Sequence, residues 1–563
     1  MLVQIKDRKY NSFSYSPPFR IETDSPHPFL HKLFHDDEII YYESQNLIKI
    51  NHSPTRSAKY LAGVLNLQSN LTYGRTPNLK RLYYSCTPYQ KELPIFLVPY
   101  DIALTFQKTP RNKFVLFRFD HWTASEKHPY GLLVETVGDV DDLQAYYEYQ
   151  LFAKYIRRKV VKLKIDFTAN NFLDPHIQNI LQNSERFGEF EDRRRSPIPI
   201  FSIDPQGCTD RDDALSIQTT EDPTIFHISV YIANVWVWLE FFQLWHLLRE
   251  TVASTIYLPD KNRHMLPTAL TETVCSLDKN KSCFAIVMDF EVNILTKKIR
   301  PIKTTQTCIY VNNYDYESKL LLWKNPNYQL LLNTTREMDP NIGDSHDVVA
   351  YWMMQMNIHM AKDLYEKKMG IFRTAKSSSE SIPETDDINI DNNIPFLRIW
   401  EQRISGEYME YDPSKPIEQY EHCILDTPLY IHFTSPIRRM VDLVNQIVWV
   451  GKHDLEDMRG DYESKTFIEK INRESKAIRK IQNECELLHS LQYIDTTETI
   501  EGVVLQLDSE RKKYMIYLPK YKGIVSCKNE NRELKKGEKV KCSIFLFQRE
   551  DDTKRKIKII ILE

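Results

Sequence analysis

The densest group of chemically active side chains lies in the segment FSIDPQGCTDRDDALSI, residues 201–217. Within ten residues it holds four aspartates: Asp204, Asp210, Asp212 and Asp213. Four carboxylates this close repel one another and lose solvation, so a bound divalent cation is a natural way to stabilise them. Ligands that are all carboxylates favour Mg²⁺ or Mn²⁺ over zinc. The segment therefore predicts a metal site, with a solvated acidic turn as the alternative.

A calcium-binding loop of the EF-hand type is a second alternative for this segment. In such a loop starting at Asp204, the twelfth position requires a bidentate glutamate. That position is occupied by Leu215, which excludes the EF-hand.

A second group of polar side chains lies in YIHFTSPIRRMVDL, residues 430–443, and surrounds Pro436. Its members are His432, Thr434, Ser435, Arg438, Arg439 and Asp442. A turn that leads into a helix can offer hydroxyls, backbone N–H groups and guanidinium forks to a phosphate. The alternative is a structural turn with surface arginines. Two interpretations also exist for Tyr257 in STIYLPD, which is either a core aromatic or a platform on which bases stack.

Taken in order along the chain, these motifs resemble the RNB catalytic domain of the ribonuclease II and ribonuclease R family. The resemblance spans residues 193–495 and extends more loosely to two cold-shock-like barrels before this region and an S1-like barrel after it. The motifs that carry it are IDPQGCTDRDDA (203–214), YLPD (257–260), MLPTALTETVCSL (265–277), KTTQTCIY (303–310), IFR (371–373) and YIHFTSPIRRMVDL (430–443).

The resemblance implies a processive, hydrolytic 3′-to-5′ exoribonuclease that degrades single-stranded RNA to nucleoside 5′-monophosphates, with Mg²⁺ or Mn²⁺ as cofactor. It implies that Asp212 and Arg438 are catalytic. Metal binding is expected of Asp204, Asp210, Asp213 and Asp212, and contacts with RNA are expected of Tyr257, His432, Thr434, Ser435 and Arg439. The alternative is a catalytically silent RNB-like protein that binds RNA or serves as a scaffold.

The chain departs from the family's pattern at several positions. Tyr231, Ile232, Ala233 and Asn234 stand where the family often has His-Ile-Ala-Asp, and Met440, Gln446 and Ile447 replace a usual Tyr and His-Arg. None of these changes removes a predicted metal ligand. We therefore expect them to alter the grip on the substrate and the length of the final product more than the chemistry.

The elements that position these residues require several domains, because 563 residues exceed what one hydrophobic core usually supports. Helical periodicity is expected over residues 346–369 and 463–494, and the polar segment 377–393 is expected to be a surface loop. We predict a multidomain α+β protein in which OB-type β-barrels flank an RNB domain of mixed sheet and helices. The expected parts are an N-terminal extension (1–40), cold-shock-like barrels (41–100 and 101–190), the RNB domain (191–495) and an S1-like barrel (496–563).

Charge is distributed unevenly along the chain. The formal net charge is −3, whereas residues 501–563 contain 16 Lys and Arg against 10 Asp and Glu. A basic β-module often binds RNA or DNA, although a solvated basic face is nearly as common. The N-terminal sequence lacks an apolar signal region, and no apolar run is long enough to span a membrane. We therefore expect a soluble intracellular protein, with the cytoplasm favoured, that acts alone or in an RNA-decay assembly.

Overall fold

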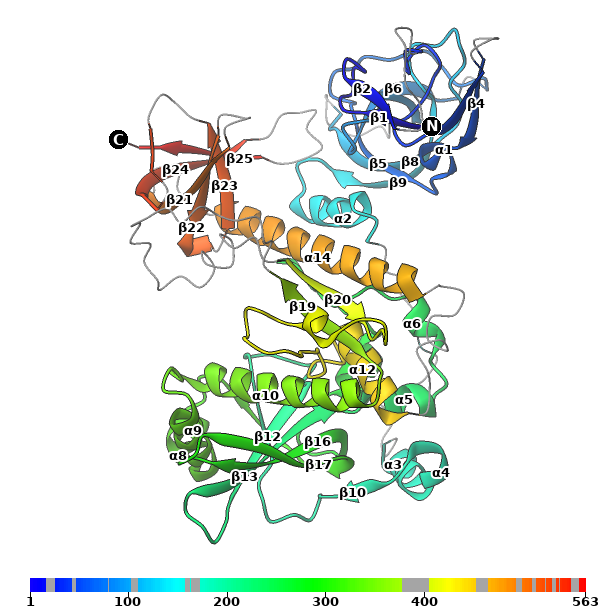
Figure 1. Cartoon of the computed structure of the whole chain (residues 1–563). Coiled ribbons are helices and arrows are strands. Elements are labelled where there is room, and N and C mark those ends of the chain that lie inside the picture. Colours follow the sequence, from blue (N-terminus) through cyan, green and yellow to red (C-terminus); the bar gives the residue numbers. More distant parts are fainter. Residues whose placement is uncertain are drawn as a thin grey trace. The chain divides into compact units, whose positions relative to one another are not determined.

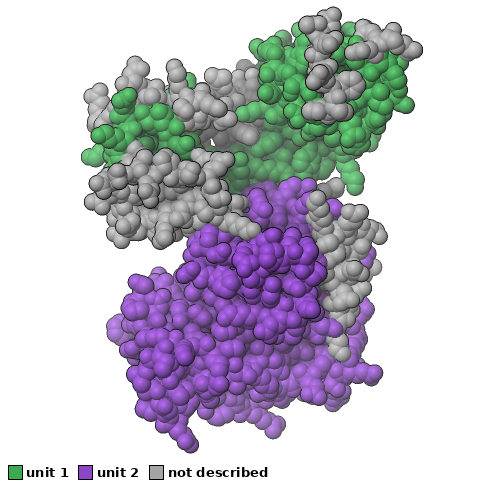
Figure 2. Space-filling model, in the orientation of Figure 1, with its two compact units in different colours: residues 1–157, 258–260, 479–563 green, residues 158–257, 261–478 purple. Residues whose placement is uncertain are grey.

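The computed structural model describes residues 1–16, 26–42, 47–78, 80–102, 110–156, 163, 173–376, 405–451, 464–492, 499–508, 513–521, 523–528, 533–535, 537–547 and 556–562. The chain forms two compact units, which are coloured differently in Figure 2. Unit 1 contains residues 1–157, 258–260 and 479–563, and unit 2 contains residues 158–257 and 261–478. The acidic loop segment 377–393 of the sequence analysis lies outside the described residues.

The N-terminal part of unit 1 contains two antiparallel sheets that share one hydrophobic core. The first has the order β2-β1-β3-β4, with β1 (Leu2–Ile5), β2 (Phe13–Ser16), β3 (Glu38–Tyr42) and β4 (Leu47–His52). The second has the order β7-β6-β5-β8-β9, with β5 (Leu61–Leu65), β6 (Leu82–Pro88), β7 (Phe96–Tyr100), β8 (Lys113–Phe119) and β9 (Gly131–Asp139). Short α1 (Pro54–Ser57) joins them, and α2 (Leu143–Ala153) follows. Val3, Phe34, Phe96 and Phe117 belong to the shared core.

These sheets correct two of the predicted boundaries. Strands β1 and β2 lie within the predicted N-terminal extension 1–40, so this segment is part of a sheet. The predicted division at residue 100 falls inside the second sheet, because β8 pairs with β5 and β7 pairs with β6. Close strand approach explains the glycine in β5, since a Cβ at Gly63 would lie 2.9 Å from the carbonyl oxygen of Thr87. Both errors arise because strand pairing joins residues that are distant in sequence.

The C-terminal part of unit 1 is a second OB-type module. Its antiparallel sheet has the order β23-β22-β21-β24-β25, formed by β21 (Ile500–Asp508), β22 (Lys513–Leu518), β23 (Gly523–Lys528), β24 (Lys539–Phe547) and β25 (Lys556–Ile561), with the 3-10 turn η4 (Pro519–Tyr521). The described part of residues 501–563, which the sequence indicates to be a basic β-module, therefore does form a β-sheet. Leu487 and Leu491 of the preceding helix α14 (Ser464–Gln492) belong to the core of this module.

A seven-stranded mixed sheet forms the base of unit 2. Its order is β10-β17-β16-β13-β12-β11-β18, with β10 (Phe190–Asp192), β11 (Phe201–Asp204), β12 (Asp213–Thr219), β13 (Ile225–Ala233), β16 (Cys283–Asn293), β17 (Lys298–Ile309) and β18 (Asn312–Asp315). On β13, Phe226, Ile228 and Val230 are buried on the face covered by α9 (Pro326–Met338) and α10 (Ser345–Glu366) (Figure 1). The helix predicted over 346–369 is therefore confirmed as α10.

The remaining elements of unit 2 lie outside this sheet (Figure 1). The helices are α3 (Leu173–Gln182), α4 (Ser184–Phe187), α5 (Val235–Phe241), α6 (His246–Glu250), α7 (Thr268–Leu270), the π-turn η2 (Thr271–Cys275), α8 (Lys319–Lys324), η3 (Ile417–Tyr420) and α12 (Met440–Val450). Helix α8 lies beside α9, and α3 and α4 lie near the opposite end of the sheet (Figure 1). Two hairpins are formed by β14 (Ile256–Tyr257) with β15 (Asn262–Arg263), and by β19 (Ile371–Lys376) with β20 (Ser405–Glu410). Among the described helices, none combines the length and apolarity that crossing a membrane requires.

Candidate active site

The acidic segment joins two neighbouring strands of the seven-stranded sheet. Asp204 is the last residue of β11 and Asp213 is the first residue of β12, so the sheet fixes both ends of the loop. Gly207 has a φ of 79°, a left-handed conformation that favours glycine where the chain turns. The loop and strand ends together form what we call the acidic cluster, which consists of Asp204, Asp210, Asp212 and Asp213.

Three carboxyl groups of the acidic cluster, those of Asp204, Asp212 and Asp213, resist ionisation in the folded protein. Burial raises the pKa of Asp212 to about 7 and the pKa of Asp204 to about 6. Burial, together with the charges of Asp204 and Asp212, raises the pKa of Asp213 well above its ordinary value. The guanidinium of Arg211 partly offsets this cost, because its Nε lies 3.5 Å from Asp204 Oδ2. A positive ligand would favour the ionised carboxylates.

The donors of the acidic cluster fit a divalent cation that prefers oxygen. Oδ2 of Asp210 is buried and has no hydrogen-bond partner, so it is an acceptor with its coordination unfilled. Carboxylate oxygens are the ligands that Mg²⁺ and Mn²⁺ prefer. The carboxylate oxygens are spaced widely, however: within the described residues, the acidic cluster does not bring three ligand atoms within 4.8 Å of one another. Asp204, Asp210 and Asp213 are the residues that would hold the cation.

Asp212 connects the acidic cluster to the second motif, more than 200 residues further along the chain. Its Oδ1 accepts a hydrogen bond from the backbone N–H of Ile437 at 2.8 Å. Its Oδ2 accepts one from Nε of Arg438 at 3.1 Å, while Nη2 of this arginine donates to Ser435 Oγ at 3.0 Å. The Asp212 side chain is 2% exposed, whereas that of Arg438 is 46% exposed. Asp212 therefore orients a guanidinium whose other edge remains open.

The other residues of the second motif have partners within the protein. The backbone N–H of Ser435 donates to Asp442 Oδ1, and Arg439 donates to both oxygens of the same carboxylate. Thr434 is buried, and His432 Nδ1 lies 2.8 Å from the hydroxyl of Tyr408. These contacts stabilise the turn that carries Arg438. Direct contacts of His432, Thr434, Ser435 and Arg439 with RNA stay a prediction.

Tyr257 lies on β14 and keeps 38% of its surface exposed, which is inconsistent with the core alternative. Partial burial raises the pKa of its hydroxyl to about 12, and the charges of Arg438 and Asp210 also act on it. The structure thus places an accessible aromatic ring beside both motifs. This position suits stacking on a base, which stays a proposal.

Sequence reasoning missed Tyr316 as a residue of this region. It follows β18, and its backbone N–H donates to the carbonyl oxygen of Asp204 at 3.1 Å. Burial raises the pKa of its hydroxyl, and the nearby charges of Asp213 and Asp204 raise it further. The segment VNNYDYES around it has no motif character. The parallel pairing of β11 with β18 that brings it here is visible only in the folded chain.

The departures from the family pattern at Asn234 and Gln446 meet at the start of α5. Asn234 caps α5 by accepting a hydrogen bond from Val237 N–H, and it donates to Gln306 Oε1 at 2.8 Å. Gln446 Oε1 accepts from the N–H groups of Val235 and Trp236, and its Nε2 donates to the carbonyl of Ala233. These side-chain amides accept hydrogen bonds from the backbone N–H groups at the start of α5, so no charged side chain is used there.

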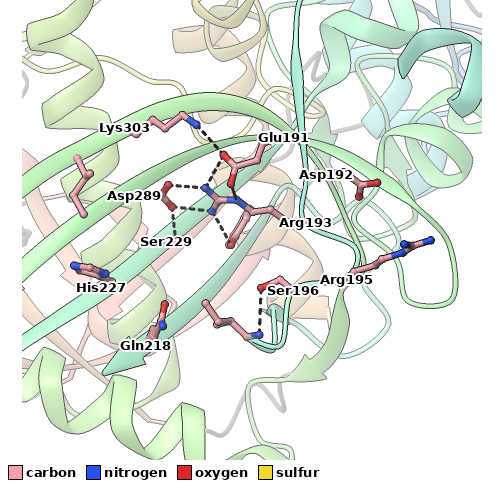
Figure 3. A pocket seen from close by; sticks show the side chains of 13 residues that line it. Glu191, Asp192, Arg193, Arg195, Ser196, Gln218, His227, Ser229, Asp289 and Lys303 are labelled. Atoms are coloured by element: carbon pink, nitrogen blue, oxygen red, sulfur yellow. Dashed lines mark hydrogen bonds and ion pairs between the residues drawn. The ribbon is translucent and has the colours of Figure 1, made fainter. Parts of the chain in front are cut away.

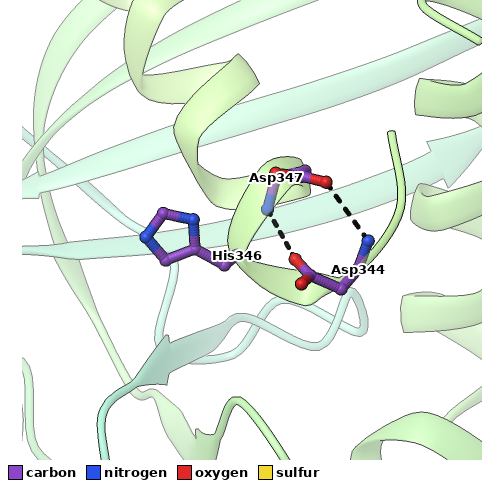
Figure 4. Close-up of side chains that lie close together, drawn as sticks. All are labelled: Asp344, His346 and Asp347. Atoms are coloured by element: carbon purple, nitrogen blue, oxygen red, sulfur yellow. Dashed lines mark hydrogen bonds between the residues drawn. The ribbon is translucent and has the colours of Figure 1, made fainter. Parts of the chain in front are cut away.

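A different acidic group, Asp344, His346 and Asp347, brings its ligand atoms within 4.8 Å of one another (Figure 4). Asp344 accepts from the N–H of Asp347, and Asp347 accepts from the N–H of Asp344, which is a capping box at the start of α10. Asp344 and His346 are exposed. This arrangement is explained by helix capping alone.

The face of the seven-stranded sheet opposite α9 and α10 carries a hollow of about 620 Å³ (Figure 3). At its floor, Arg193 donates to both oxygens of Asp289 at 2.9 and 2.6 Å and to both oxygens of Glu191. Lys303 lies 3.0 Å from Glu191. The two positive and two negative side chains neutralise one another. Their ion pairs connect the end of β10 to β16 and β17, so this network stabilises the edge of the sheet.

Comparison with known proteins identifies the domain that carries the acidic cluster. Residues 191–319 match the family model of the RNB domain, and residues 83–152 match the Dis3-like cold-shock domain 2 (CSD2). The chain contains an RNB domain. It is 23% identical over 431 residues to the exosome complex exonuclease RRP44 of Homo sapiens, which covers 64% of this chain and 43% of that protein. The chain thus spans less than half the length of this relative.

Solved structures confirm the fold class. The apo form of Mycoplasma genitalium RNase R superposes with a TM-score of 0.66 at 15% identity, covering 94% of this chain and 95% of that one. Yeast Ssd1, a pseudonuclease, superposes with a TM-score of 0.59 at 15% identity, covering 90% and 69%. The predicted combination of an RNB domain with OB-type modules is therefore confirmed. The fold alone does not imply activity, since a pseudonuclease shares it.

Proposed function

We propose that the protein is a hydrolytic exoribonuclease that removes nucleotides processively from the 3′ end of single-stranded RNA and releases nucleoside 5′-monophosphates. The observation that carries this proposal is the pairing of Asp212 with Arg438 beside three further aspartates. It unites carboxylates suited to a cation with a guanidinium suited to a phosphate in one place.

Each residue has a distinct task in this proposal. Asp212 fixes the guanidinium of Arg438, whose open edge would bind oxygens of the phosphate under attack. Asp204, Asp210 and Asp213 would hold Mg²⁺ or Mn²⁺. When bound, the cation would stabilise negative charge at the phosphate and favour attack by water. Tyr257 would stack on a base near the 3′ end.

The alternative, a silent scaffold like the pseudonuclease with a similar fold, is disfavoured by the cost of the acidic cluster. The cluster keeps a buried carboxylate oxygen of Asp210 without a hydrogen-bond partner and raises the pKa of three aspartates. A protein that only binds RNA has no need of this arrangement, because phosphates repel carboxylates.

The proposal is tested by comparing linear and circular single-stranded RNA of one sequence in the presence of Mg²⁺. An exonuclease degrades the linear molecule and spares the circle, which has no end. Cleavage of the circle would indicate an endonuclease. Binding of both molecules without cleavage of either would indicate the scaffold.

Tyr257→Ala is expected to lengthen the final oligonucleotide while long RNA is still degraded. Stacking is worth roughly 1–3 kcal/mol per base, and near the end of digestion few other contacts hold the RNA. Gel analysis of the limit products measures this effect, and a thermal melt serves as the control. Because the ring is 38% exposed, the melting temperature should change little. An unchanged limit product with a depressed melt would show a purely structural role.

The C-terminal module is expected to contribute electrostatically to RNA binding. Lys528, Lys539 and Lys541 are exposed on β23 and β24. Replacing all three by glutamine should flatten the plot of log affinity against log salt by about 0.7 for each phosphate that the lysines no longer neutralise. This variant is preferable to deleting the module, which would uncover Leu487 and Leu491. An unchanged slope would show that these lysines do not contact RNA.

A further inference from the structure

Helix α14 contacts the main chain of a distant segment through a buried carboxylate. Glu474 is 8% exposed, and its Oε2 accepts a hydrogen bond from the backbone N–H of Ala253 at 3.0 Å. One turn earlier, Lys470 Nζ donates to the carbonyl of Thr251 at 3.4 Å. Burial of an acid is costly unless its oxygens are used, so this contact calls for an explanation.

The segment that Glu474 holds, residues 251–257, is here named the strap. Ser254 of the strap forms an antiparallel β-bridge with Arg439, the residue that precedes α12. The N–H of Thr255 donates to the carbonyl of Arg438 at 2.8 Å, and the N–H of Met440 donates to the carbonyl of Ala253 at 2.9 Å. The backbone N–H of Ala253 thus bonds to α14, and its backbone carbonyl bonds to the turn that carries Arg438.

The strap also ends at the aromatic ring of the site. Tyr257 is its last residue, and the bond from Thr255 to Arg438 lies only two residues before it. Thr255 Oγ1 further accepts the N–H of Met265 at 3.0 Å, which fixes the strap from the side opposite the turn. A displacement of the strap would therefore move the main chain of Arg438 and the ring of Tyr257 together.

We propose that Glu474 is a positioning residue, which holds the strap so that Arg438 and Tyr257 keep their places beside the acidic cluster. This inference rests on the proposed function. What Glu474 must supply is an acceptor for one backbone N–H, and a glutamine can supply the same acceptor with its amide oxygen. An alanine removes the acceptor and leaves the N–H of Ala253 buried without a partner.

The experiment compares Glu474→Ala with Glu474→Gln, and with Glu486→Ala as a matched control at an exposed position of the same helix. Glu474→Ala should lower the single-turnover cleavage rate at saturating RNA on the order of tenfold to a hundredfold, because small displacements at a reacting centre have effects of this size. Its affinity for long RNA should stay within about threefold of the wild type, since most contacts with a long RNA are expected outside the strap. Glu474→Gln and Glu486→Ala should cleave at nearly the wild-type rate.

Amide hydrogen exchange provides a readout that does not depend on activity. In Glu474→Ala, peptides covering 251–257 and 437–441 should exchange faster than in the wild type, whereas Glu474→Gln should protect them. A wild-type cleavage rate in Glu474→Ala, or unchanged exchange in 437–441, would overturn the inference. If Glu474→Ala does not fold, Glu474→Gln decides. A lower cleavage rate in Glu474→Gln without faster exchange in 437–441 would overturn the inference. A wild-type cleavage rate and wild-type exchange in Glu474→Gln would support it. A wild-type protein that does not cut RNA refutes the proposed function instead, and exchange still decides whether Glu474 fixes the arginine-bearing turn.

Discussion

Asp212→Asn is expected to reduce the turnover of single-stranded RNA by roughly a thousandfold or more, as the loss of a central electrostatic group does in other enzymes. The asparagine keeps an acceptor for the N–H of Ile437. Where the native carboxylate accepts from Arg438, however, the variant presents an amide NH₂, which cannot accept a hydrogen bond. The guanidinium therefore loses its orienting partner, and the cluster loses a negative charge.

Binding of RNA should survive in this variant, because the proposed function places most contacts with RNA outside the acidic cluster. Turnover and dissociation constants measured side by side test the distinction. Asp222→Asn is a matched control, since it makes the same change in the exposed turn between β12 and β13. Turnover of Asp212→Asn at the level of this control would refute the catalytic assignment.

Removal of divalent cations is expected to abolish cleavage, and Mg²⁺ or Mn²⁺ should restore it. The physical reason is the acidic cluster, in which three carboxyl groups are held near one another and Oδ2 of Asp210 is buried without a hydrogen-bond partner. Cleavage assays with EDTA and then with added metal measure the effect. Asp210→Asn should need a higher Mg²⁺ concentration for half-maximal activity. Cleavage that persists undiminished in EDTA would contradict the metal assignment.

The same cluster predicts a pH dependence of stabilisation by Mg²⁺. The folded-state pKa values of Asp204 and Asp212, about 6 and about 7, lie above the ordinary value of 3.8. Ionising these groups without a cation therefore lowers the free energy of unfolding as the pH rises from about 4 to about 7. Mg²⁺ offsets this loss, so it should raise the melting temperature more at about pH 8 than at about pH 5. Equal shifts at both values would argue against cation binding in the acidic cluster.

The chemistry of the site was accessible from the sequence because it is concentrated in two short segments. The crowding of Asp204, Asp210, Asp212 and Asp213 in one segment predicts a cation site, and strands β11 and β12 hold the two ends of this segment. The long helices α10 and α14 were likewise predictable, since their apolar residues recur at helical spacing over many turns.

What the sequence could not provide is the set of contacts between distant segments. Nothing in the local pattern indicates that both oxygens of Asp212 are used by Ile437 and Arg438, or that Tyr316 approaches the acidic cluster. The same limit explains the incorrect boundary at residue 100, where β5 pairs with β8 across the predicted division. Pairing of this kind depends on tertiary packing, which periodicity in one segment does not encode.

The central claim, directional removal of nucleotides from the 3′ end, is tested most directly by a time course on one single-stranded RNA labelled at either its 5′ or its 3′ end, with Mg²⁺ present. The account predicts that the 3′ label appears at once as a mononucleotide, while the 5′-labelled molecule passes to one short final oligonucleotide. Release of the 5′ label as a mononucleotide, a ladder of internal fragments from both substrates, or intact RNA in both reactions would contradict it.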